Sequence, residues 1–211
     1  RCGSRVLADM LSQHIQIKWD GEIYERTIQS ITKLRGDFVY GSPEYRYDAV
    51  SILTNRLNIF KHINYGFEVK YRHLEHCGLT VEEYVQILDK LNVDRFIVLR
   101  RRNILRKIIS SLIASRSGEW HTTNEKMKPA TKIHLNTQEI IIERKADNLL
   151  AHLRQYSDYM NKLDDMLADK STLQLTYEDD LENNPVVGFE KTIDFLGLPT
   201  TNPIVHLRKT N

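Results

Sequence analysis

Two segments of the chain combine residue types that bind phosphate groups in proteins. Residues 100–102 are three consecutive arginines, followed by Asn103 and, seven residues after it, by Ser110. Two helical turns separate Asn103 from Ser110, so an arginine fork and a serine hydroxyl can converge on one phosphate. Residues 1–5 (RCGSR) precede a helical pattern. Backbone N–H groups at such a turn carry the positive end of the helix and can hold a second phosphate.

The elements expected around the arginines place them at the end of a strand. Residues 96–99 (FIVL) are wholly apolar and partly β-branched, which is typical of a strand buried on both faces of a parallel sheet. A helix is expected directly after them, over residues 104–115, with Asn103 as its N-cap. Ligands bind beyond the carboxyl ends of parallel strands, and residues 100–102 lie there.

The rest of the chain shows strands and helices in alternation. Apolar spacing predicts strands over residues 65–71 and 172–177, and helices over residues 4–14, 48–62, 80–92, 136–168 and a last one ending at Gly197. We therefore predict an α/β fold with a central parallel sheet flanked by helices, in a single domain over residues 1–211.

Local signals mark the starts of two helices and one long loop. Thr80 with Glu83 and Asn136 with Glu139 have the spacing of capping boxes. Residues 116–129 are polar and without periodicity, and long loops in compact domains are often functional. We expect this loop, which carries Trp120 and His121, to face an acceptor substrate.

Composition limits where such a site can lie. The 211 residues contain 30 Lys and Arg against 28 Asp and Glu, a net charge of +2, so any basic site is local and a nucleic-acid binder is disfavoured. Cys2 and Cys77 are the two cysteines, which we interpret as free thiols in a reducing compartment. No apolar run has the length of a membrane span, and no N-x-[ST] acceptor occurs. These features predict a cytoplasmic protein.

Three ordered motifs resemble one enzyme family. Residues 1–4 (RCGS) resemble an R-S-G-S-T loop, Arg102 with Ser110 resembles an arginine eight residues before a serine, and residues 177–179 (YED) with 195–198 (FLGL) resemble a late Y-E-D and F-L-G-L segment. On these motifs the chain is similar to sulfotransferases that use 3′-phosphoadenosine 5′-phosphosulfate (PAPS). The bacterial or polysaccharide-type branch is nearest, because residues 21–24 (GEIY) match its G-E-I-F segment and residues 101–114 its 3′-phosphate helix.

The resemblance implies a fold, a reaction and site residues. It implies a three-layer P-loop-like fold whose first strand precedes Arg1 and whose basic C-terminal segment continues past the chain. It implies sulfuryl transfer from PAPS to an acceptor hydroxyl, with a carbohydrate or glycolipid favoured, and without a metal. The residues that it assigns to PAPS are Arg1, Cys2, Gly3, Ser4, Arg5, Arg102, Ser110, Tyr177 and Lys209, with a weaker assignment of Arg208.

The resemblance also assigns the catalytic groups. Arg1 matches the family's basic residue that stabilises charge on the leaving phosphate oxygen, and Glu22 matches its glutamate base. The alternative bases are Glu25, Glu44 and His73.

The chain departs from the family at two positions, and two competing functions remain as alternatives. Cys2 and Arg5 stand where the family carries hydroxyl residues, which leaves open a sulfotransferase-like protein that binds the nucleotide without turnover. A P-loop phosphotransferase is disfavoured, because G-x-x-x-x-G-K-[ST] is absent. Each candidate site also has an ordinary structural explanation. Residues 1–5 can form a helix cap, and residues 100–102 can be a run of solvated charges. Glu22 can be an ordinary carboxylate in a loop.

Overall fold

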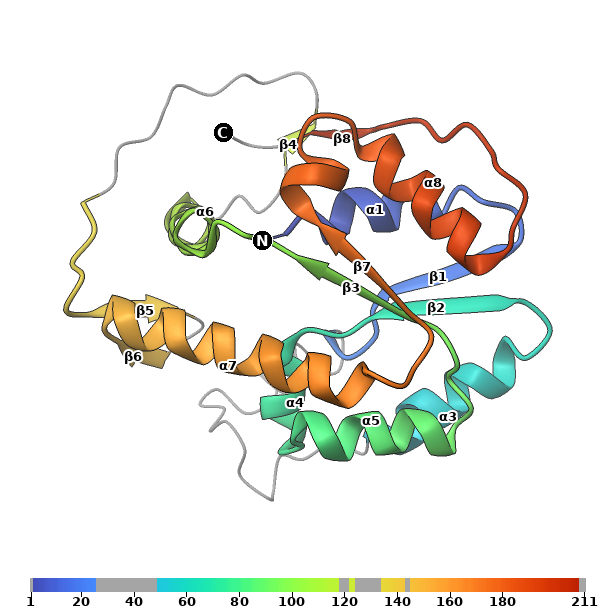
Figure 1. Cartoon of the computed structure of the whole chain (residues 1–211), viewed down its shortest axis with the longest axis horizontal. Helices are drawn as coiled ribbons and strands as arrows, with labels where there is room; N and C mark the ends of the chain where they lie inside the picture. The colour runs from blue at the N-terminus through green and yellow to red at the C-terminus, as the bar shows by residue number, and fades with distance from the viewer. Residues whose placement is uncertain (1, 26–48, 118–121, 124–133, 143–144, 209–211) are drawn as a thin grey trace. The chain divides into compact units, whose positions relative to one another are not determined.

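The computed structural model describes residues 2–25, 49–117, 122–123, 134–142 and 145–208 (Figure 1). The chain divides into two compact units, one formed by residues 1–11 and 95–211 and the other by residues 12–94. Each unit is described by itself below. The single domain expected over residues 1–211 stays a prediction, because a division into compact units does not test which parts fold independently.

The discontinuous unit is built around a pair of parallel strands. Its elements are α1 (Ser4–Leu11), β3 (Phe96–Arg100), α6 (Ile104–Ser117), β4 (Thr122–Thr123), β5 (Ile140–Ile142), β6 (Lys145–Asp147), α7 (Leu149–Leu167), β7 (Thr172–Thr176), the π-helical turn η2 (Tyr177–Leu181), α8 (Pro185–Leu196) and β8 (Leu207–Arg208). β3 and β7 pair in parallel from Phe96 opposite Thr172 to Arg100 opposite Thr176. Both strands therefore end at the same edge, side by side in Figure 1.

The core of this unit lies where α1 packs against α8. Met10, Leu11, Phe189 and Ile193 are at most 1 % exposed. In α1 the buried residues fall on one face of the helix, as the apolar spacing predicted. Burial of these side chains attaches the first helix of the chain to the last one, so α1 has a fixed position in its unit.

Two predicted helix starts in this unit have different outcomes. Asn103 caps α6 as predicted, because its Oδ1 accepts a hydrogen bond of 2.8 Å from the backbone N–H of Arg106. The helix predicted from Asn136 is wrong in its first part. Ile140–Ile142 form β5, which pairs with β6 in an antiparallel hairpin, and the helix begins at Leu149.

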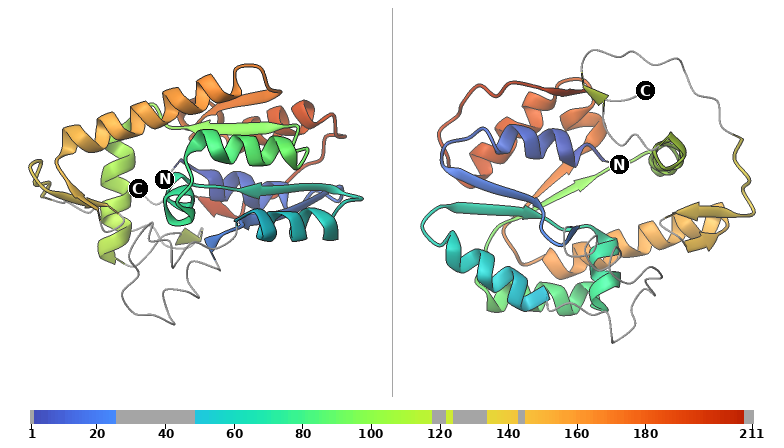
Figure 2. Two further views of the ribbon diagram at one scale, coloured as in Figure 1. Left: turned by 90° about the horizontal axis from the view of Figure 1, so that it is seen from below. Right: turned by 180° about the vertical axis from the view of Figure 1, so that it is seen from behind.

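β-Branched side chains explain the later start of α7. Three successive isoleucines lose side-chain freedom in a helix and favour a strand. Asn148 then offers a stronger cap, because its side chain accepts a hydrogen bond of 2.9 Å from the N–H of Ala151. Figure 2 shows the resulting arrangement, in which α6 runs across α7 rather than alongside it.

The second unit contains its own parallel pair. Its elements are β1 (Ile17–Glu22), α3 (Ala49–Ile59), β2 (Asn64–Glu68), α4 (Tyr71–Cys77) and α5 (Val81–Lys90). β1 pairs with β2 from Ile17 opposite Asn64, with an irregularity before Glu22 opposite Glu68. Gly66 is required in β2, because a Cβ there would lie 2.6 Å from the ring of Trp19.

The sequence predicted part of this unit. α3 and α5 lie within the ranges expected for them, and the Thr80–Glu83 capping box forms, with hydrogen bonds of 2.8 and 3.2 Å. The strand expected over residues 65–71 ends at Glu68, and Tyr71 begins α4 instead. β1 was not expected as a strand, although Ile17 and Trp19 alternate with Lys18 and Asp20, because this alternation covers only four residues before Gly21.

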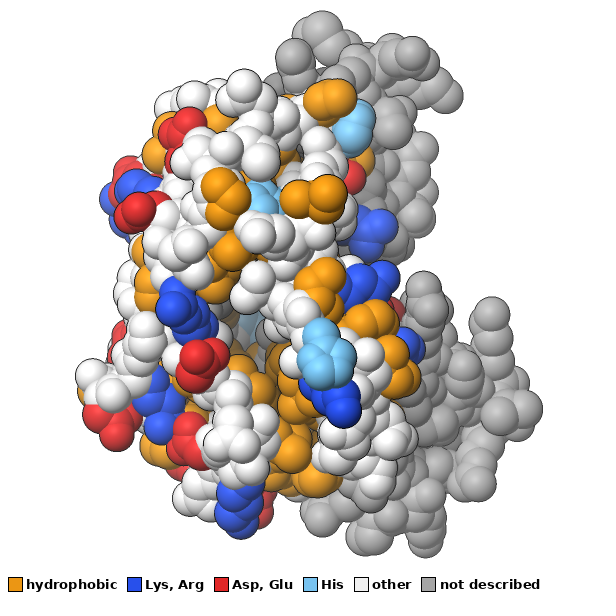
Figure 3. All heavy atoms as spheres, turned by 90° about the vertical axis from the view of Figure 1, so that its right-hand side faces the viewer, with side chains coloured by type: hydrophobic (Ala, Val, Ile, Leu, Met, Phe, Trp, Pro, Cys, Tyr) orange, Lys and Arg blue, Asp and Glu red, His pale blue; other side chains and the backbone are white. Residues whose placement is uncertain are grey.

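The mixed α/β class and the parallel pairing are thus confirmed for the described residues. No helix in the part of the chain that the structure describes is long and apolar enough to cross a membrane. On the face drawn in Figure 3, described basic side chains lie interspersed with acidic ones. The described side chains on that face therefore form no broad basic surface of the kind that a polyanion binds.

Candidate functional site

The carboxyl ends of β3 and β7 bring two of the sequence motifs together. Residues 100–102 leave β3 at this edge, and residues 177–179 leave β7 at the same edge, because the two strands are parallel and in register. The arginine run and the Tyr-Glu-Asp segment are therefore neighbours in space. We call this edge the arginine edge.

The first loop of the chain also reaches the arginine edge. Gly3 has φ +81°, and a Cβ built on it would lie 2.9 Å from Cδ2 of Tyr177 and 3.1 Å from Cδ1 of Leu181. The loop backbone thus packs directly on the Tyr177 ring, which leaves no space for a side chain at position 3. The carbonyl of Gly3 accepts the N–H groups of Val6 (2.9 Å) and Leu7 (3.3 Å), so the loop opens directly into α1.

Arg101 is the buried arginine of the run. It is 4 % exposed, and its guanidinium lies 4.6 Å from the centroid of the Tyr177 ring. Its Nε is 3.9 Å from a carboxylate oxygen of Glu178. Sequence reasoning selected Arg102 and missed Arg101, because three identical residues in succession carry no signal of which one turns inward.

Glu178 closes the N-terminus of α6. Its two carboxylate oxygens accept the backbone N–H groups of Arg102 (3.0 Å) and Asn103 (3.1 Å). Burial would raise the pKa of Glu178, but backbone hydrogen bonds, from Asn103 and Arg102 first, and the charge of Arg101 together hold the pKa below the ordinary value. A carboxylate of the chain therefore occupies the helix terminus at which an external anion would otherwise bind.

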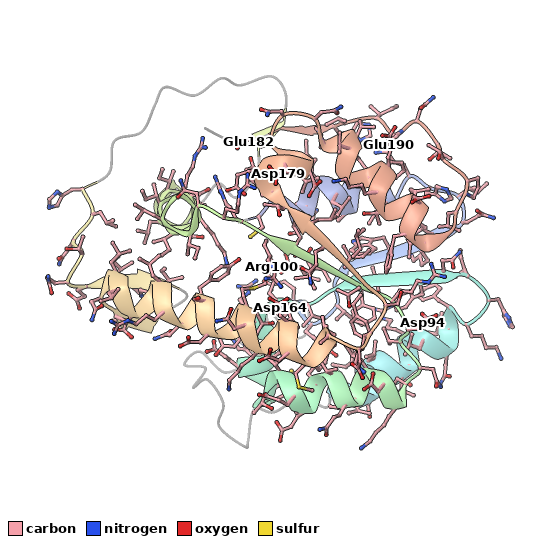
Figure 4. The ribbon with its side chains drawn as sticks, viewed as in Figure 1. Asp94, Arg100, Asp164, Asp179, Glu182 and Glu190 are labelled. Carbon is pink, nitrogen blue, oxygen red and sulfur yellow. The ribbon has the colours of Figure 1, made fainter. Side chains whose placement is uncertain are left out.

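Arg102 holds a second carboxylate at the surface. Its Nη1 and Nη2 atoms each lie 2.7 Å from an oxygen of Asp179 in a bidentate pair. Both side chains are exposed, at 64 % for Arg102 and 56 % for Asp179. Arg106 makes a similar pair with Glu182, at 3.1 Å, on the same turn. Figure 4 labels Asp179 and Glu182 on this turn, and Arg100 beside Asp164.

Cys2 is linked to the arginine edge through Tyr156 of α7. The phenol of Tyr156 interacts with the Cys2 thiol and with the backbone of Arg101, and Lys107 Nζ lies 3.6 Å from the centroid of its ring. Burial first and then the Cys2 thiol raise the pKa of Tyr156. Tyr156 therefore connects the first loop to the end of β3, a role that its place in an apolar helical pattern did not indicate.

The structure places the remaining predicted nucleotide residues in the same unit. Ser4 begins α1, Arg5 is exposed on it, and Ser110 is half-buried on α6. No hydrogen bond between described residues joins Ser110 to Arg102. Arg1, Lys209, Glu44, Trp120 and His121 lie outside the described residues, as does the side chain of Arg208.

Glu22 belongs to a different cluster, in the unit of residues 12–94. It stands at the end of β1 with Lys70 Nζ 2.6 Å and Arg72 Nη2 3.4 Å from its carboxylate. Arg72 also contacts Glu25 at 2.5 Å. His73 Nε2 lies 3.5 Å from Glu22 and 3.5 Å from Glu25. We call these five residues the carboxylate cluster.

His73 has a defined orientation in the carboxylate cluster. It is fully buried, and its Nδ1 accepts the backbone N–H of Lys70 at 3.1 Å. A neutral imidazole that accepts at Nδ1 carries its hydrogen at Nε2, so that hydrogen points at the two carboxylates. Two glutamates predicted as alternatives, Glu22 and Glu25, are thus held by one histidine.

The carboxylate cluster has ligand atoms that a metal ion could use. One atom each from Glu22, Glu25 and His73 lie within 4.8 Å of one another. A metal at His73 Nε2 would, however, move the hydrogen to Nδ1, where it would face the N–H of Lys70. Lys70 and Arg72 already balance the two carboxylates. The donor set therefore fits a metal ion poorly.

The environment of Glu22 bears on its assignment as a base. Burial would raise its pKa, but hydrogen bonds from His73 and Lys70 and the charge of Lys70 hold the pKa well below the ordinary value. A carboxylate stabilised in this way is a weaker base than an ordinary one. Sequence reasoning did not anticipate Lys70 and Arg72 as partners, because both lie on another element far along the chain.

No family model, curated protein or solved structure is significantly similar to the chain. The arginine edge and the carboxylate cluster are therefore interpreted from their own chemistry and from the motifs in the sequence.

Proposed function

We propose that this chain is a PAPS-dependent sulfotransferase that transfers a sulfuryl group to the hydroxyl of an acceptor, with carbohydrates and glycolipids as the favoured class. The observation that carries the proposal is the packing of Gly3 on Tyr177, with Arg101 on the same ring. Three motifs that are far apart in the sequence meet at one edge of a parallel strand pair. Such edges are where α/β proteins bind nucleotides.

The arginine edge offers a position for each end of the nucleotide. Residues 2–5 and the N-terminus of α1 suit the 5′-phosphosulfate, since backbone donors and the helix dipole both favour an anion there. Arg102, with Ser110 on the following helix, suits the 3′-phosphate. Tyr177 is 6 % exposed beneath Gly3, so we assign it to supporting the loop rather than to stacking on adenine.

The proposed fold extends the described strand pairs. We propose that these pairs belong to a three-layer P-loop-like fold, and the alternation of strand and helix in β3–α6 and β7–η2–α8 supports this proposal. The bacterial or polysaccharide-type branch is proposed because Gly21 and Glu22 match its G-E segment.

The proposed chemistry is an in-line displacement. The acceptor oxygen bonds to sulfur as the bond from sulfur to the 5′-phosphate oxygen breaks, and Glu22 takes the acceptor proton. Arg1 stabilises the charge that develops on the departing phosphate. Arginine supplies the positive charge that the reaction needs, so transfer is expected to persist in excess chelator.

Nucleotide selectivity tests the proposal. Adenosine 3′,5′-bisphosphate should raise the melting temperature, and 5′-AMP should raise it far less, because it lacks the group that Arg102 binds. Arg102→Ala should remove most of the difference. Arg106→Ala is the matched control, because it deletes a nearby arginine in the first turn of α6, which also pairs with a carboxylate. Equal shifts with both nucleotides would refute the proposed 3′-phosphate site.

A second candidate function is binding of the nucleotide without turnover. It is favoured by the ion pairs of Glu22, whose carboxylate is already neutralised by Lys70 at 2.6 Å. The test combines nucleotide binding with a panel of hydroxyl acceptors. This candidate is supported if adenosine 3′,5′-bisphosphate binds tightly but no labelled sulfuryl group is transferred from PAPS to any acceptor.

A further inference from the structure

The amino ends of β1 and β2 carry exposed apolar side chains. Ile15, two residues before β1, is 90 % exposed. Ile59, the last residue of α3, is 65 % exposed, and Ile63, directly before β2, is 41 % exposed. All three belong to the unit of residues 12–94. We call these three side chains the isoleucine surface.

Strand pairing brings the isoleucine surface to one edge of its unit. Ile17 lies opposite Asn64 in the parallel pair, and the Asn64 side-chain amide donates a hydrogen bond of 3.1 Å to the carbonyl of Gln16. The turn between α3 and β2 is closed by a hydrogen bond of 3.1 Å from the N–H of Ile63 to the carbonyl of Phe60. Figure 1 shows α3 turning into β2 at this edge. Single exposed apolar residues are common, whereas several at one edge indicate a surface that contacts a partner.

The segments that form this edge contain basic residues and no acidic ones. Residues 10–19 and 49–67 include no Asp or Glu. The exposed basic residues among them are Lys18, Lys61 and His62. Lys18 Nζ lies 5.5 Å from the centroid of the Phe60 ring, so this lysine lies against the turn between α3 and β2. Apolar side chains flanked by ammonium groups are complementary to a partner that is anionic at its surface and apolar beneath it.

The side chains at this edge that could anchor a protein partner are engaged within the unit. Arg56 Nε lies 3.4 Å from a carboxylate oxygen of Asp20, and the Tyr65 hydroxyl donates a hydrogen bond of 2.8 Å to the same oxygen. The Tyr65 ring also stacks on Phe60, with 5.1 Å between the centroids. Arginine and aromatic side chains dominate the affinity of protein interfaces. The groups left to meet a partner are aliphatic chains and ammonium groups, which a lipid surface accepts without a fixed geometry.

A second copy of the chain is a poorer occupant of the isoleucine surface. Pairing two such surfaces about a two-fold axis brings Lys18 and Lys61 of one copy close to the same residues of the other. Like charges at an interface are unfavourable, and no acidic residue in the two segments compensates them. Charge therefore favours an anionic partner.

We propose that the isoleucine surface docks this protein reversibly on anionic lipid membranes. The isoleucines enter the boundary between headgroups and acyl chains, and Lys18 and Lys61 contact the anionic headgroups. The inference goes beyond the proposed function and does not rest on it. Each lysine near an anionic membrane contributes about 5-fold in affinity, and each apolar side chain contributes in proportion to the area that it buries. Because few groups are involved, strong binding requires both contributions.

Vesicle binding of the full chain tests the inference. Co-sedimentation compares vesicles made of equal parts of phosphatidylcholine and phosphatidylserine with vesicles of phosphatidylcholine alone. Wild type should bind the anionic vesicles at least about 5-fold more tightly. Salt at about 1 M should remove most of this difference, because the Debye length falls to about 3 Å.

Two double variants separate the apolar contribution from the charged one. Ile15→Ser with Ile59→Ser should weaken binding to the anionic vesicles by about 10-fold or more, because both side chains lose their apolar area. Lys18→Gln with Lys61→Gln should weaken it by about 5- to 25-fold and leave binding to phosphatidylcholine nearly unchanged. All four positions are exposed, so the melting temperature should stay close to that of wild type.

Ile141→Ser with Leu150→Ser is the matched control, because these residues are 60 % and 54 % exposed and belong to the other unit. It should leave vesicle binding unchanged. Equal binding of wild type to both kinds of vesicle, absence of binding to the anionic vesicles, or equal losses in the control and in the isoleucine variant would overturn the inference. Self-association of wild type that is abolished by Ile15→Ser with Ile59→Ser, together with no vesicle binding, would assign the surface to a second copy instead.

Discussion

The arginine edge and the carboxylate cluster both pair carboxylates with basic side chains, but they differ in how far these groups are exposed to water. Each lies at the carboxyl end of a parallel strand pair and each contains both signs of charge. At the arginine edge the outer pair is exposed, with Arg102 64 % accessible, whereas the carboxylate cluster is assembled on His73, which is 0 % exposed. The outer ion pair of the arginine edge is therefore accessible to water. The carboxylate cluster fixes its anions in place.

This contrast suggests different tasks. An exposed ion pair suits a site that binds and releases a charged ligand. Water solvates both partners when the pair separates, so the change in free energy is small. A fixed carboxylate suits a group that must be ionised and held in one orientation before it accepts a proton. The following predictions test whether the two regions differ in this way, from the largest expected effect to the smallest.

Replacing the carboxylate that we assign as base should have the largest effect. Glu22→Gln keeps the shape and removes the proton acceptor, so turnover should fall by about 10² to 10⁴ while nucleotide affinity stays within a few-fold. The measurement is single-turnover transfer from labelled PAPS. Glu25→Gln is the matched control, because Glu25 shares Arg72 and His73 with Glu22. Near-normal turnover in Glu22→Gln, with loss in Glu25→Gln or His73→Ala, would assign the base elsewhere.

Removing the buried histidine should destabilise the fold. His73→Ala leaves the Lys70 N–H without its acceptor and opens a cavity under two carboxylates, so we expect a loss of about 2 to 4 kcal/mol in the free energy of unfolding. Urea denaturation measures it. His206→Ala is the control, because His206 is 54 % exposed and should change stability by less than about 0.5 kcal/mol. Similar losses in the two variants would contradict a structural role for His73.

The loop on Tyr177 should tolerate no side chain. Gly3→Ala introduces a methyl group 2.9 Å from the Tyr177 ring at φ +81°. Gly197→Ala has the same left-handed backbone strain at φ +67°, but no atom lies within 4 Å of its Cβ. Both should lose about 1 kcal/mol from the strain, and Gly3→Ala should lose about 1 to 3 kcal/mol more from overpacking. Equal midpoints in urea would show that the loop is not packed as described.

The loss of folding stability at acid pH should depend on Glu22 in the carboxylate cluster. The pKa of Glu22 is held below its ordinary value, since hydrogen bonds and the charge of Lys70 outweigh burial. The stability that it contributes is therefore present above about pH 4.3, the unfolded value, and is lost as pH falls through the folded pKa. Urea midpoints measured between pH 5 and pH 2.5 should fall less steeply in Glu22→Gln than in wild type. Identical slopes would mean that Glu22 is not stabilised in its ionised form.

The sequence predicted the elements whose signals are local. Asn103 caps a helix because its side chain bonds three residues ahead, and residues 96–99 form a strand because apolar β-branched residues favour one. The predicted start of α7 at Asn136 was wrong, because the three isoleucines that follow this capping signal favour a strand. The alternating pattern of β1 covers only residues 17–20, and the pairing with β2 extends the strand to Glu22.

The candidate sites were predictable only as separate parts. Gly3, Arg102 and Tyr177 could be selected by residue type, but their meeting depends on the register of β3 with β7. In the sequence, Glu178 and Asp179 were recognised as part of the Y-E-D motif. The sequence did not indicate that they bond to the arginine run. The grouping of Glu22 with His73 likewise depends on strand pairing across a long stretch of chain, for which one sequence contains no signal.

The discontinuity of the first unit has a consequence for synthesis. α1 is buried against α8, and the Gly3 loop is supported by Tyr177, so neither can reach its place until Tyr177 and α8 have been synthesised. Residues 12–94 are contiguous and can assemble their parallel pair much earlier. We expect the carboxylate cluster to form before the arginine edge, so α1 is organised later than residues 12–94, which follow it in the sequence.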